Sequence, residues 1–351
     1  MWYSAPGDIL IERNGMTVAN RVACEDGHQV VVAAGTESKL MPIGLEHHLG
    51  DTPEERKTWY GRGDAEAIGA MKDAGALVFL QHTENWDIET IIDLPVNGIE
   101  VYNMHQNLMT NMGAAFGLIL LLEATPEVVP EMELAMVALF RENDVYITKW
   151  AQTVAVKPIV SIMASDVHQN ALKGESPDGE RIDSFRRIMH WFSNYVLIDP
   201  KVDTDDATFK EAIGKGRMYG AFDYLGYPAG FYFYAQSAEG DIFEMGEQIA
   251  ANTELTLHVS KPEVYHVNPE GEQPEIRVIL LKADGDHWTE VATGDSDITY
   301  NIESPGVYRA EVRMTPYHLR QWLGSEPEQY LNEFIWIYSN PVYAGMNYGQ
   351  R

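Results

Sequence analysis

An aspartate and a histidine two positions apart follow a strand-length apolar run in the middle of the chain. Residues 159–163 are apolar apart from one serine, and Ala164 and Ser165 then lead to Asp166 and His168. On an extended chain, side chains at positions i and i+2 point to the same side, so this strand end presents a carboxylate and an imidazole together. Both groups bind Zn²⁺ and other divalent cations. The alternative is a solvated loop in which Asp166 caps the next helix.

Further ligand-type residues stand at or near the ends of extended segments in the first half of the chain. Adjacent residues of a strand face opposite sides, so at most one of two neighbouring histidines can point toward a common centre. Five ligand-type positions that arise in this way are hard to explain as core histidines, and they predict a shared cation site. Besides Asp166 and His168, the positions are Glu37 after residues 29–34, His47 and His48 within residues 41–50, and His82 after residues 76–81.

The elements that must position these side chains alternate between strands and helices. This alternation is typical of an α/β barrel or a doubly wound sheet, in which chemistry gathers at the carboxyl ends of the strands. Trp150 is expected in or near a connecting turn. Strands are predicted at residues 29–34, 76–81, 98–103 and 159–163, and helices at residues 16–24, 52–74, 86–93, 131–143, 184–196 and 209–214.

The pattern changes near residue 227, where short strands follow one another without long helices between them. Turn residues separate these strands, as in residues 284–286 and 304–306. This spacing favours a β-sandwich of the immunoglobulin-like type. We therefore predict an α/β domain over residues 1–226 and a β-sandwich domain over residues 227–351. The predicted strands of the second part are residues 230–235, 255–259, 277–282, 299–302, 307–312 and 334–338.

Composition limits the classes of function. The chain has 351 residues and a net charge of −28, which argues against binding to a nucleic-acid backbone. Its one cysteine, Cys24, excludes an internal disulfide and a thiolate zinc cluster. The longest apolar run, residues 114–122, is too short to span a bilayer. The first residues show no signal peptide.

Several segments together resemble the PHP (polymerase and histidinol phosphatase) metal-dependent phosphoesterases, in the form that carries a C-terminal β-sandwich. The likeness covers nearly the whole chain, and the ordered set of segments is more specific than any one of them. The matching segments are residues 35–37 (GTE), 47–50 (HHLG), 81–83 (QHT), 98–103 (GIEVYN), 164–170 (ASDVHQN), 214–223 (GKGRMYGAFD), 305–312 (PGVYRAEV) and 336–343 (WIYSNPVY).

The resemblance implies a distorted seven-stranded β/α barrel that holds two or three divalent ions, with Zn²⁺, Mn²⁺ or Fe²⁺ best suited to mixed histidine and carboxylate ligands. The substrate would be a small phosphorylated molecule. Arg217 could clamp a phosphate oxygen, although a surface salt bridge is an equal alternative for it. His105 and Lys149 are weaker candidates. By resemblance, the ligand positions are Glu37, His47 or His48, His82, Asp166 and His168.

One part of the family pattern is absent. The family opens with a His-x-His on its first strand and an Asp-His soon after, and no histidine precedes His28 here. Residues 29–34 would correspond to the third strand of the barrel, which leaves the barrel incomplete at its N-terminus. Either Met1 is an internal start within a longer gene or the chain is a degenerate member, and we favour the first because the other ligands remain. An export signal could then lie upstream, so localisation stays open.

Phosphoester hydrolysis at a polynuclear metal centre is the leading hypothesis for function. An amidohydrolase-type barrel is a second hypothesis, weakened because no predicted strand end offers a lysine. A non-catalytic binding protein that uses the aromatic strip at residues 231–234 is a third. Neither the identity of the substrate nor the oligomeric state can be determined from the sequence.

Overall fold

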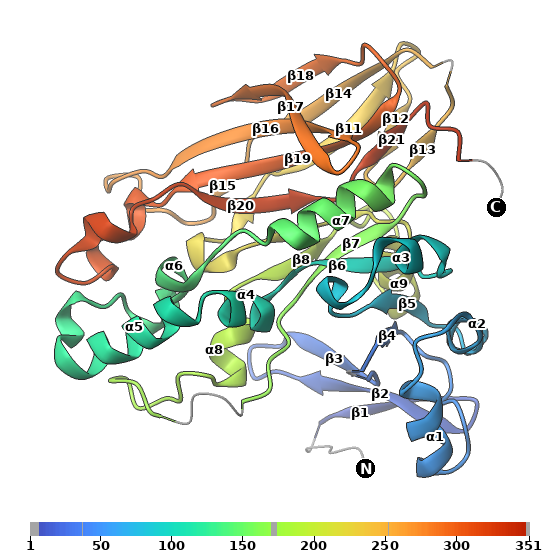
Figure 1. Ribbon diagram of the computed structural model, residues 1–351, viewed down its shortest axis with the longest axis horizontal. Coiled ribbons are helices and arrows are strands. Elements are labelled where there is room, and N and C mark those ends of the chain that lie inside the picture. The colour runs from blue at the N-terminus through green and yellow to red at the C-terminus, as the bar shows by residue number, and fades with distance from the viewer. Residues whose placement is uncertain (1–6, 37, 170–173, 252, 349–351) are drawn as a thin grey trace.

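The computed structural model describes residues 7–36, 38–169, 174–251 and 253–348. The chain is a mixed α/β protein with several sheets, and its C-terminal part is rich in strands (Figure 1). Elements from both halves contribute to one large hydrophobic core, which runs from Leu40 near the N-terminus to Ala344 near the C-terminus.

The first three strands form a small antiparallel sheet, β1 (Ile9–Arg13), β2 (Met16–Ala23) and β3 (Gln29–Ala33). The helix predicted over residues 16–24 is therefore wrong. The strand predicted at residues 29–34 is present as β3, but its continuous apolar run also predicted a buried strand of a parallel sheet, and that is wrong, because β3 pairs antiparallel with β2 and all five of its residues are exposed. An unbroken apolar run favours a strand through its β-branched residues, but it does not decide which element covers that strand.

The central sheet has the order β4 (Leu40–Ile43), β5 (Leu77–Leu80), β6 (Gly98–Asn103) and β7 (Val160–Ala164). Strands β5, β6 and β7 run parallel, as their continuous apolar patterns predict. Strand β4 runs antiparallel to β5, with Leu40 opposite Leu80 and Ile43 opposite Leu77. The predicted strands at residues 76–81, 98–103 and 159–163 are thus confirmed. Among the described residues, no strand pairing closes this sheet into a barrel.

Several predicted helices differ from those observed. The helix expected over residues 52–74 is two helices, and the one expected over residues 184–196 is a short helix followed by a strand. Residues 131–143 form only short helical turns, and Trp150 lies within a helix. The helices are α1 (Pro53–Tyr60), α2 (Ala65–Asp73), α3 (Ile88–Asp93), α4 (Met104–Thr110), α5 (Met112–Ala124), α6 (Met136–Leu139), α7 (Asp144–Val154), α8 (Phe185–Met189) and α9 (Asp206–Gly214). Short 3₁₀ turns are η1 (Thr83–Asn85), η2 (Pro126–Val128), η3 (Met132–Leu134), η4 (Asp223–Leu225), η5 (Tyr317–Trp322) and η6 (Pro327–Tyr330).

The strands predicted after residue 227 are confirmed, and they belong to more than one sheet. An eight-stranded sheet contains β8 (Ser193–Val196), β9 (Met218–Ala221), β13 (Gln248–Ile249), β16 (Glu275–Asp284), β17 (His287–Gly294), β19 (Gly306–Thr315), β20 (Phe334–Ser339) and β21 (Val342–Ala344). A four-stranded sheet contains β11 (Tyr232–Ser237), β12 (Ile242–Glu244), β14 (Leu255–Ser260) and β18 (Ile298–Asn301), and β10 (Pro228–Ala229) pairs with β15 (Glu263–Val264).

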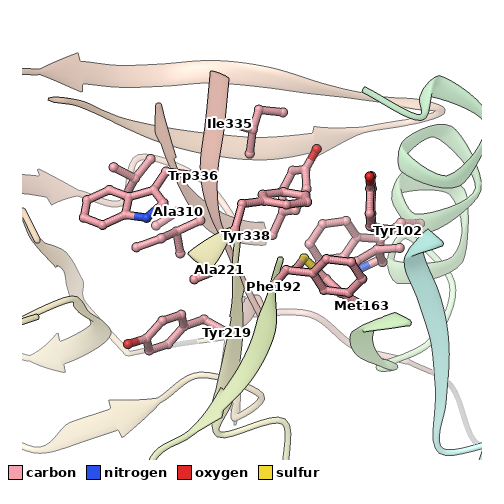
Figure 2. Packing of buried hydrophobic residues seen from close by; sticks show 14 of the residues in the cluster. Tyr102, Met163, Phe192, Tyr219, Ala221, Ala310, Ile335, Trp336 and Tyr338 are labelled. Atoms are coloured by element: carbon pink, nitrogen blue, oxygen red, sulfur yellow. The ribbon is translucent and has the colours of Figure 1, made fainter. Parts of the chain in front are cut away.

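Strands from both sides of the predicted boundary at residue 226 share the eight-stranded sheet, because β9 pairs with β20. Figure 2 shows the packing at this junction, where Tyr102 and Met163 lie near Phe192 and Tyr338. The ring of Phe222 packs edge-on against that of Tyr338, with ring centroids 6.2 Å apart. The α/β part and the β-rich part therefore share buried side chains.

Two asparagine side chains join β7 to the eight-stranded sheet in place of a backbone ladder. The amide of Asn340 accepts the N–H of Ser161 at 2.8 Å and donates to the carbonyls of Ser161 and Met218 at 2.9 and 3.0 Å. The amide of Asn194 likewise accepts the N–H of Met163 at 3.0 Å and donates to its carbonyl at 2.8 Å. These bonds satisfy backbone groups that burial would otherwise leave unpaired.

We expect Asn340→Ala to lower the free energy of unfolding by about 1–3 kcal/mol, because it leaves buried backbone groups of Ser161 and Met218 without these partners. Urea denaturation followed by tryptophan fluorescence measures the change. Asn332→Ala is the control, since this exposed side chain donates to the carbonyl of nearby Gln329, and its effect should stay within about 0.5 kcal/mol. Equal effects of the two changes would contradict the role of Asn340.

A buried carboxyl in η4 gives stability a predictable pH dependence. Burial raises the pKa of Asp223, against hydrogen bonds from the side chains of Ser193 and Tyr195, and the Tyr195 hydroxyl lies 2.6 Å from Oδ1. The folded protein keeps this proton to a higher pH than the unfolded chain. The free energy of unfolding therefore falls as pH rises from the ordinary aspartate pKa through the raised value.

Asp223→Asn removes this titration and keeps an oxygen that can accept from Tyr195. We expect the variant to gain stability relative to the wild type as pH rises from about 4 to about 7. Urea denaturation at several pH values in this window measures the difference. A difference that does not change with pH would contradict the assignment.

No single helix among the described residues is long and apolar enough to cross a membrane. The pair α4 and α5, which is bent by 85°, passes the same test of length and composition when taken together.

Candidate metal centre

The carboxyl ends of β5, β6 and β7 bring histidines and an aspartate together at one edge of the central sheet. His82 follows β5, His105 lies in the first turn of α4 directly after β6, and Asp166 and His168 follow β7. Parallel strands of a sheet end at the same edge, so residues distant in sequence become neighbours there. The structure thus unites three of the predicted ligands, His82, Asp166 and His168, and adds His105.

Asp166 is the centre of this cluster, and its side chain is 3% exposed. Its Oδ2 lies 3.2 Å from Nδ1 of His105 and 3.7 Å from Nε2 of His82. Its Oδ1 lies 2.7 Å from Nε2 of His168. Among the described residues, no donor has the angles of a hydrogen bond to Oδ1. Three imidazoles therefore surround one buried carboxylate.

Backbone strain is concentrated at the same place. His82 has φ 51° and Asp166 has φ 48°, both in the left-handed region that residues other than glycine seldom adopt. Such conformations cost about 1–3 kcal/mol each and persist only where surrounding contacts enforce them. They are common at functional sites, and here they occur where two strands deliver their ligand-type side chains.

Hydrogen bonds to neighbouring carboxylates hold His82 in place. Its ring nitrogen Nδ1 lies 3.3 Å from Oε1 of Glu84, and its backbone N–H donates to Oε2 of Glu100 at 2.9 Å. Glu100 lies within β6 and is 2% exposed. Burial raises the pKa of Glu100 to about 7, against the hydrogen bonds from the backbone of His82 and from the amide of Asn103, which lower it. Glu100 therefore anchors the start of the turn that carries His82.

Side chains from α7 fix the rest of that turn. The ammonium group of Lys149 donates to the carbonyls of Thr83, Glu84 and Trp86 at 3.0, 2.8 and 2.5 Å. The hydroxyl of Tyr146 donates to Oε2 of Glu84. Lys149 thus serves as a backbone anchor, and its contacts explain why it is not one of the clustered side chains.

His105 lies in the cluster, although from the sequence it was one of the weaker candidates. Asn103 at the end of β6 caps α4, and its Oδ1 accepts the N–H of Gln106 at 3.0 Å. This cap starts the helix at once and places His105 in its first turn, beside Asp166. The signal was available, because His105 follows the predicted strand at residues 98–103 just as His82 and Asp166 follow theirs.

His47 and His48 are placed away from the cluster, contrary to expectation. Because β4 runs antiparallel to β5, the segment that follows Ile43 lies at the start of β5, the edge opposite His82. Nε2 of His48 lies 3.0 Å from the carbonyl oxygen of Thr17 in β2. Spacing along the sequence could not reveal this, since it does not show the direction in which β4 pairs.

Arg217 also lies apart from the cluster. It directly precedes β9, and its guanidinium donates to Oε1 of Glu247 at 2.9 Å, which is the salt bridge considered as its alternative. The adjacent Gly216 lies against Val160 at the start of β7, whereas Asp166 follows the end of that strand. Arg217 and Asp166 are therefore at opposite ends of β7.

Glu37 lies outside the described residues. Its neighbours in the chain both contact Gln81, the residue before His82. The amide of Gln81 donates to the carbonyl of Thr36 at 3.1 Å and accepts the N–H of Ser38 at 2.8 Å.

Two cavities meet at Asp166. The first has a volume of about 470 Å³ and is lined in part by His82, Glu100 and Asn103. The second has a volume of about 200 Å³ and is lined in part by His105 and His168. Asp166 lines both of them. The side chain of Asp166 thus lies between the two cavities.

The arrangement fits a divalent cation by the chemistry of its donors. One ligand atom each from His105, Asp166 and His168 can be chosen within 4.8 Å of one another. Imidazole and carboxylate ligands suit Zn²⁺, Mn²⁺ and Fe²⁺. Comparisons with protein-family models, with curated proteins and with solved structures returned no match.

Proposed function

We propose that the protein is a metal-dependent hydrolase that acts on small phosphate esters, with His82, His105, Asp166 and His168 as ligands of one or more divalent ions. In this proposal the chain is a PHP-like α/β domain with an incomplete barrel, followed by an immunoglobulin-like sandwich. The parallel strands β5 to β7, with ligands at their carboxyl ends, support the first part. The antiparallel sheets after residue 227 support the second.

The observation that carries the proposal is the position of Asp166 among three imidazoles. A neutral His82 that donates from Nδ1 to Glu84 turns the lone pair of its Nε2 toward Oδ2 of Asp166, 3.7 Å away. Two acceptors then face each other, and a cation between them would satisfy both. A carboxylate on the outer nitrogen of a metal-binding histidine is a common arrangement, since it fixes the tautomer and the ring orientation.

Each residue has a defined part in this reaction. A bound divalent ion would supply a water of lowered pKa and would neutralise the phosphate oxygens during displacement. Asp166, with its two oxygens directed at different imidazoles, would hold the ligand set together. Glu84 would orient His82, and Glu100 would fix the turn that carries it.

The test is hydrolysis of p-nitrophenyl phosphate by purified protein with Mn²⁺, with Zn²⁺ and after treatment with EDTA. We expect release of nitrophenol that depends on the metal and is lost in EDTA. Titration calorimetry with Mn²⁺ alone should show binding in the absence of substrate. Binding without hydrolysis of any phosphate ester would reject the phosphoesterase, and absence of binding would reject the metal centre itself.

A further inference from the structure

We infer that the substrate carries an apolar group, a short alkyl chain or a single aromatic ring, which binds in the 200 Å³ cavity beside Asp166. This inference rests on the proposed function and specifies its substrate class. The cavity lies between α4, α5 and the segment that follows β7, and its lining is mainly aliphatic and aromatic. Leu108, Phe116, Ile119 and Trp191 are among its lining residues.

The wall of this cavity includes the proposed ligands themselves. His105, Asp166 and His168 line it together with the apolar side chains of α5. Asp166 also lines the larger cavity that contains His82 and Glu100. A phosphate ester whose phosphorus lies at the cluster would thus adjoin both cavities, and the smaller of them has the more apolar lining. The position next to the reacting centre distinguishes this cavity from an apolar surface elsewhere on the molecule.

The size of the cavity limits the group that it can hold. A cavity of about 150 Å³ lined by aliphatic and aromatic side chains accepts benzene. A volume of 200 Å³ therefore suits one ring or a chain of about six carbons, and a long acyl chain would not fit inside it.

The cavity also reaches the surface through apolar side chains. Met109, Met112 and Phe116 line it and are 53%, 43% and 59% exposed. Helix α5 lies at the edge of the molecule, as Figure 1 shows. Large apolar side chains that remain exposed in a group often mark a binding site. An apolar substituent could pass between these side chains to reach the cluster.

The inference predicts how activity depends on chain length. A fully buried methylene should raise kcat/KM about fourfold, so the four additional methylenes of hexyl phosphate should raise it by up to about 250-fold over ethyl phosphate with Mn²⁺ present. Ile119→Trp fills the cavity and should remove this preference while ethyl phosphate is still hydrolysed. Leu120→Trp is the matched control, because Leu120 is the next residue of α5, is 65% exposed and does not line the cavity.

A second variant covers the case in which Ile119→Trp fails to fold. Ile119→Ala enlarges the cavity and should move the preferred substrate toward octyl phosphate. A kcat/KM that is unchanged from ethyl to hexyl phosphate in the wild type would overturn the inference and leave the phosphoesterase intact. The inference would also be overturned, with the phosphoesterase intact, if Ile119→Trp and Leu120→Trp showed the same preference for chain length.

A binding experiment distinguishes failure of the apolar subsite from failure of the proposed phosphoesterase activity. If no phosphate ester is hydrolysed, binding of hexylphosphonate and ethylphosphonate to the Mn²⁺-loaded protein is compared by calorimetry. Tighter binding of the hexyl compound, lost in Ile119→Trp, supports the apolar subsite without the reaction. Equal affinities, or no binding of either compound, overturn it.

Discussion

Replacing Asp166 with asparagine should lower metal-dependent hydrolysis of p-nitrophenyl phosphate by at least about 100-fold in kcat/KM. The change removes the charge at the centre of three imidazoles and leaves one acceptor oxygen where there were two. Loss of a group that only supports a metal ligand typically costs 10- to 100-fold, and loss of the central ligand should cost no less. Asparagine has nearly the same shape and tolerates the left-handed backbone at φ 48°, so the fold should be retained.

The thermal unfolding midpoint gives a second readout that does not require activity. Ligands that bind only the folded state stabilise it, so Mn²⁺ should raise the midpoint of the wild type and leave that of Asp166→Asn almost unchanged. His287→Asn is the control, because this histidine is largely exposed and its ion-pair partners, Asp284 and Asp286, lie in its own hairpin. An Asp166→Asn protein that keeps its response to Mn²⁺ would show that Asp166 is not a ligand.

Replacing Glu311 with glutamine should lower the free energy of unfolding by about 3–5 kcal/mol. Glu311 lies in β19, its side chain is 5% exposed, and it accepts from Arg309 at 2.9 Å and from Arg313 at 2.8 Å. The Arg309 side chain is 2% exposed, and its guanidinium lies 5.0 Å from the ring centroid of Trp150 in α7. Removing the carboxylate leaves the buried Arg309 cation without its counter-charge. An uncompensated buried charge strongly destabilises the folded state.

Urea denaturation at neutral pH measures this loss. Glu66→Gln is the matched control, because Glu66 pairs with Arg62 but is 73% exposed, and such a pair contributes at most about 1 kcal/mol. Arg309 also lies 4.7 Å from the ring centroid of Trp288 in β17, so the pair sits where α7 packs against the β-rich part. An effect of Glu311→Gln as small as that of the control would mean that water reaches the pair.

The local pattern of apolar and polar residues was sufficient to predict the strands on which the candidate site is built. Continuous apolar runs predicted β5, β6 and β7, and a polar residue directly after a run marked the carboxyl end of each strand. The spacing of apolar residues typical of a helix was also present in residues 144–154, where no helix was predicted. Tyr146, Trp150 and Val154 are spaced by four and are all buried in α7, although Trp150 was expected in a turn. Helix α5 escaped prediction because it is apolar on all sides and shows no period.

Pairing direction and burial could not be obtained from local pattern. Residues 29–33 contain the same β-branched residues as a buried strand, yet Val30 and Val32 are each 51% exposed in an antiparallel pair with β2. The direction of β4 had a larger consequence for the candidate site than the exposure of β3. It placed His47 and His48 at the opposite edge of the sheet from His82, although the sequence groups all three as strand-end histidines.

The sequence by itself determined that an aspartate and histidines follow parallel strands, because strand propensity and side-chain alternation are properties of a few adjacent residues. Only the tertiary structure decided which of them meet. A carboxylate becomes central when three strands end at one edge and a helix cap directs His105 toward it, and these are relations between segments far apart in the chain. The same reason explains the apolar cavity beside Asp166, which no single segment encloses.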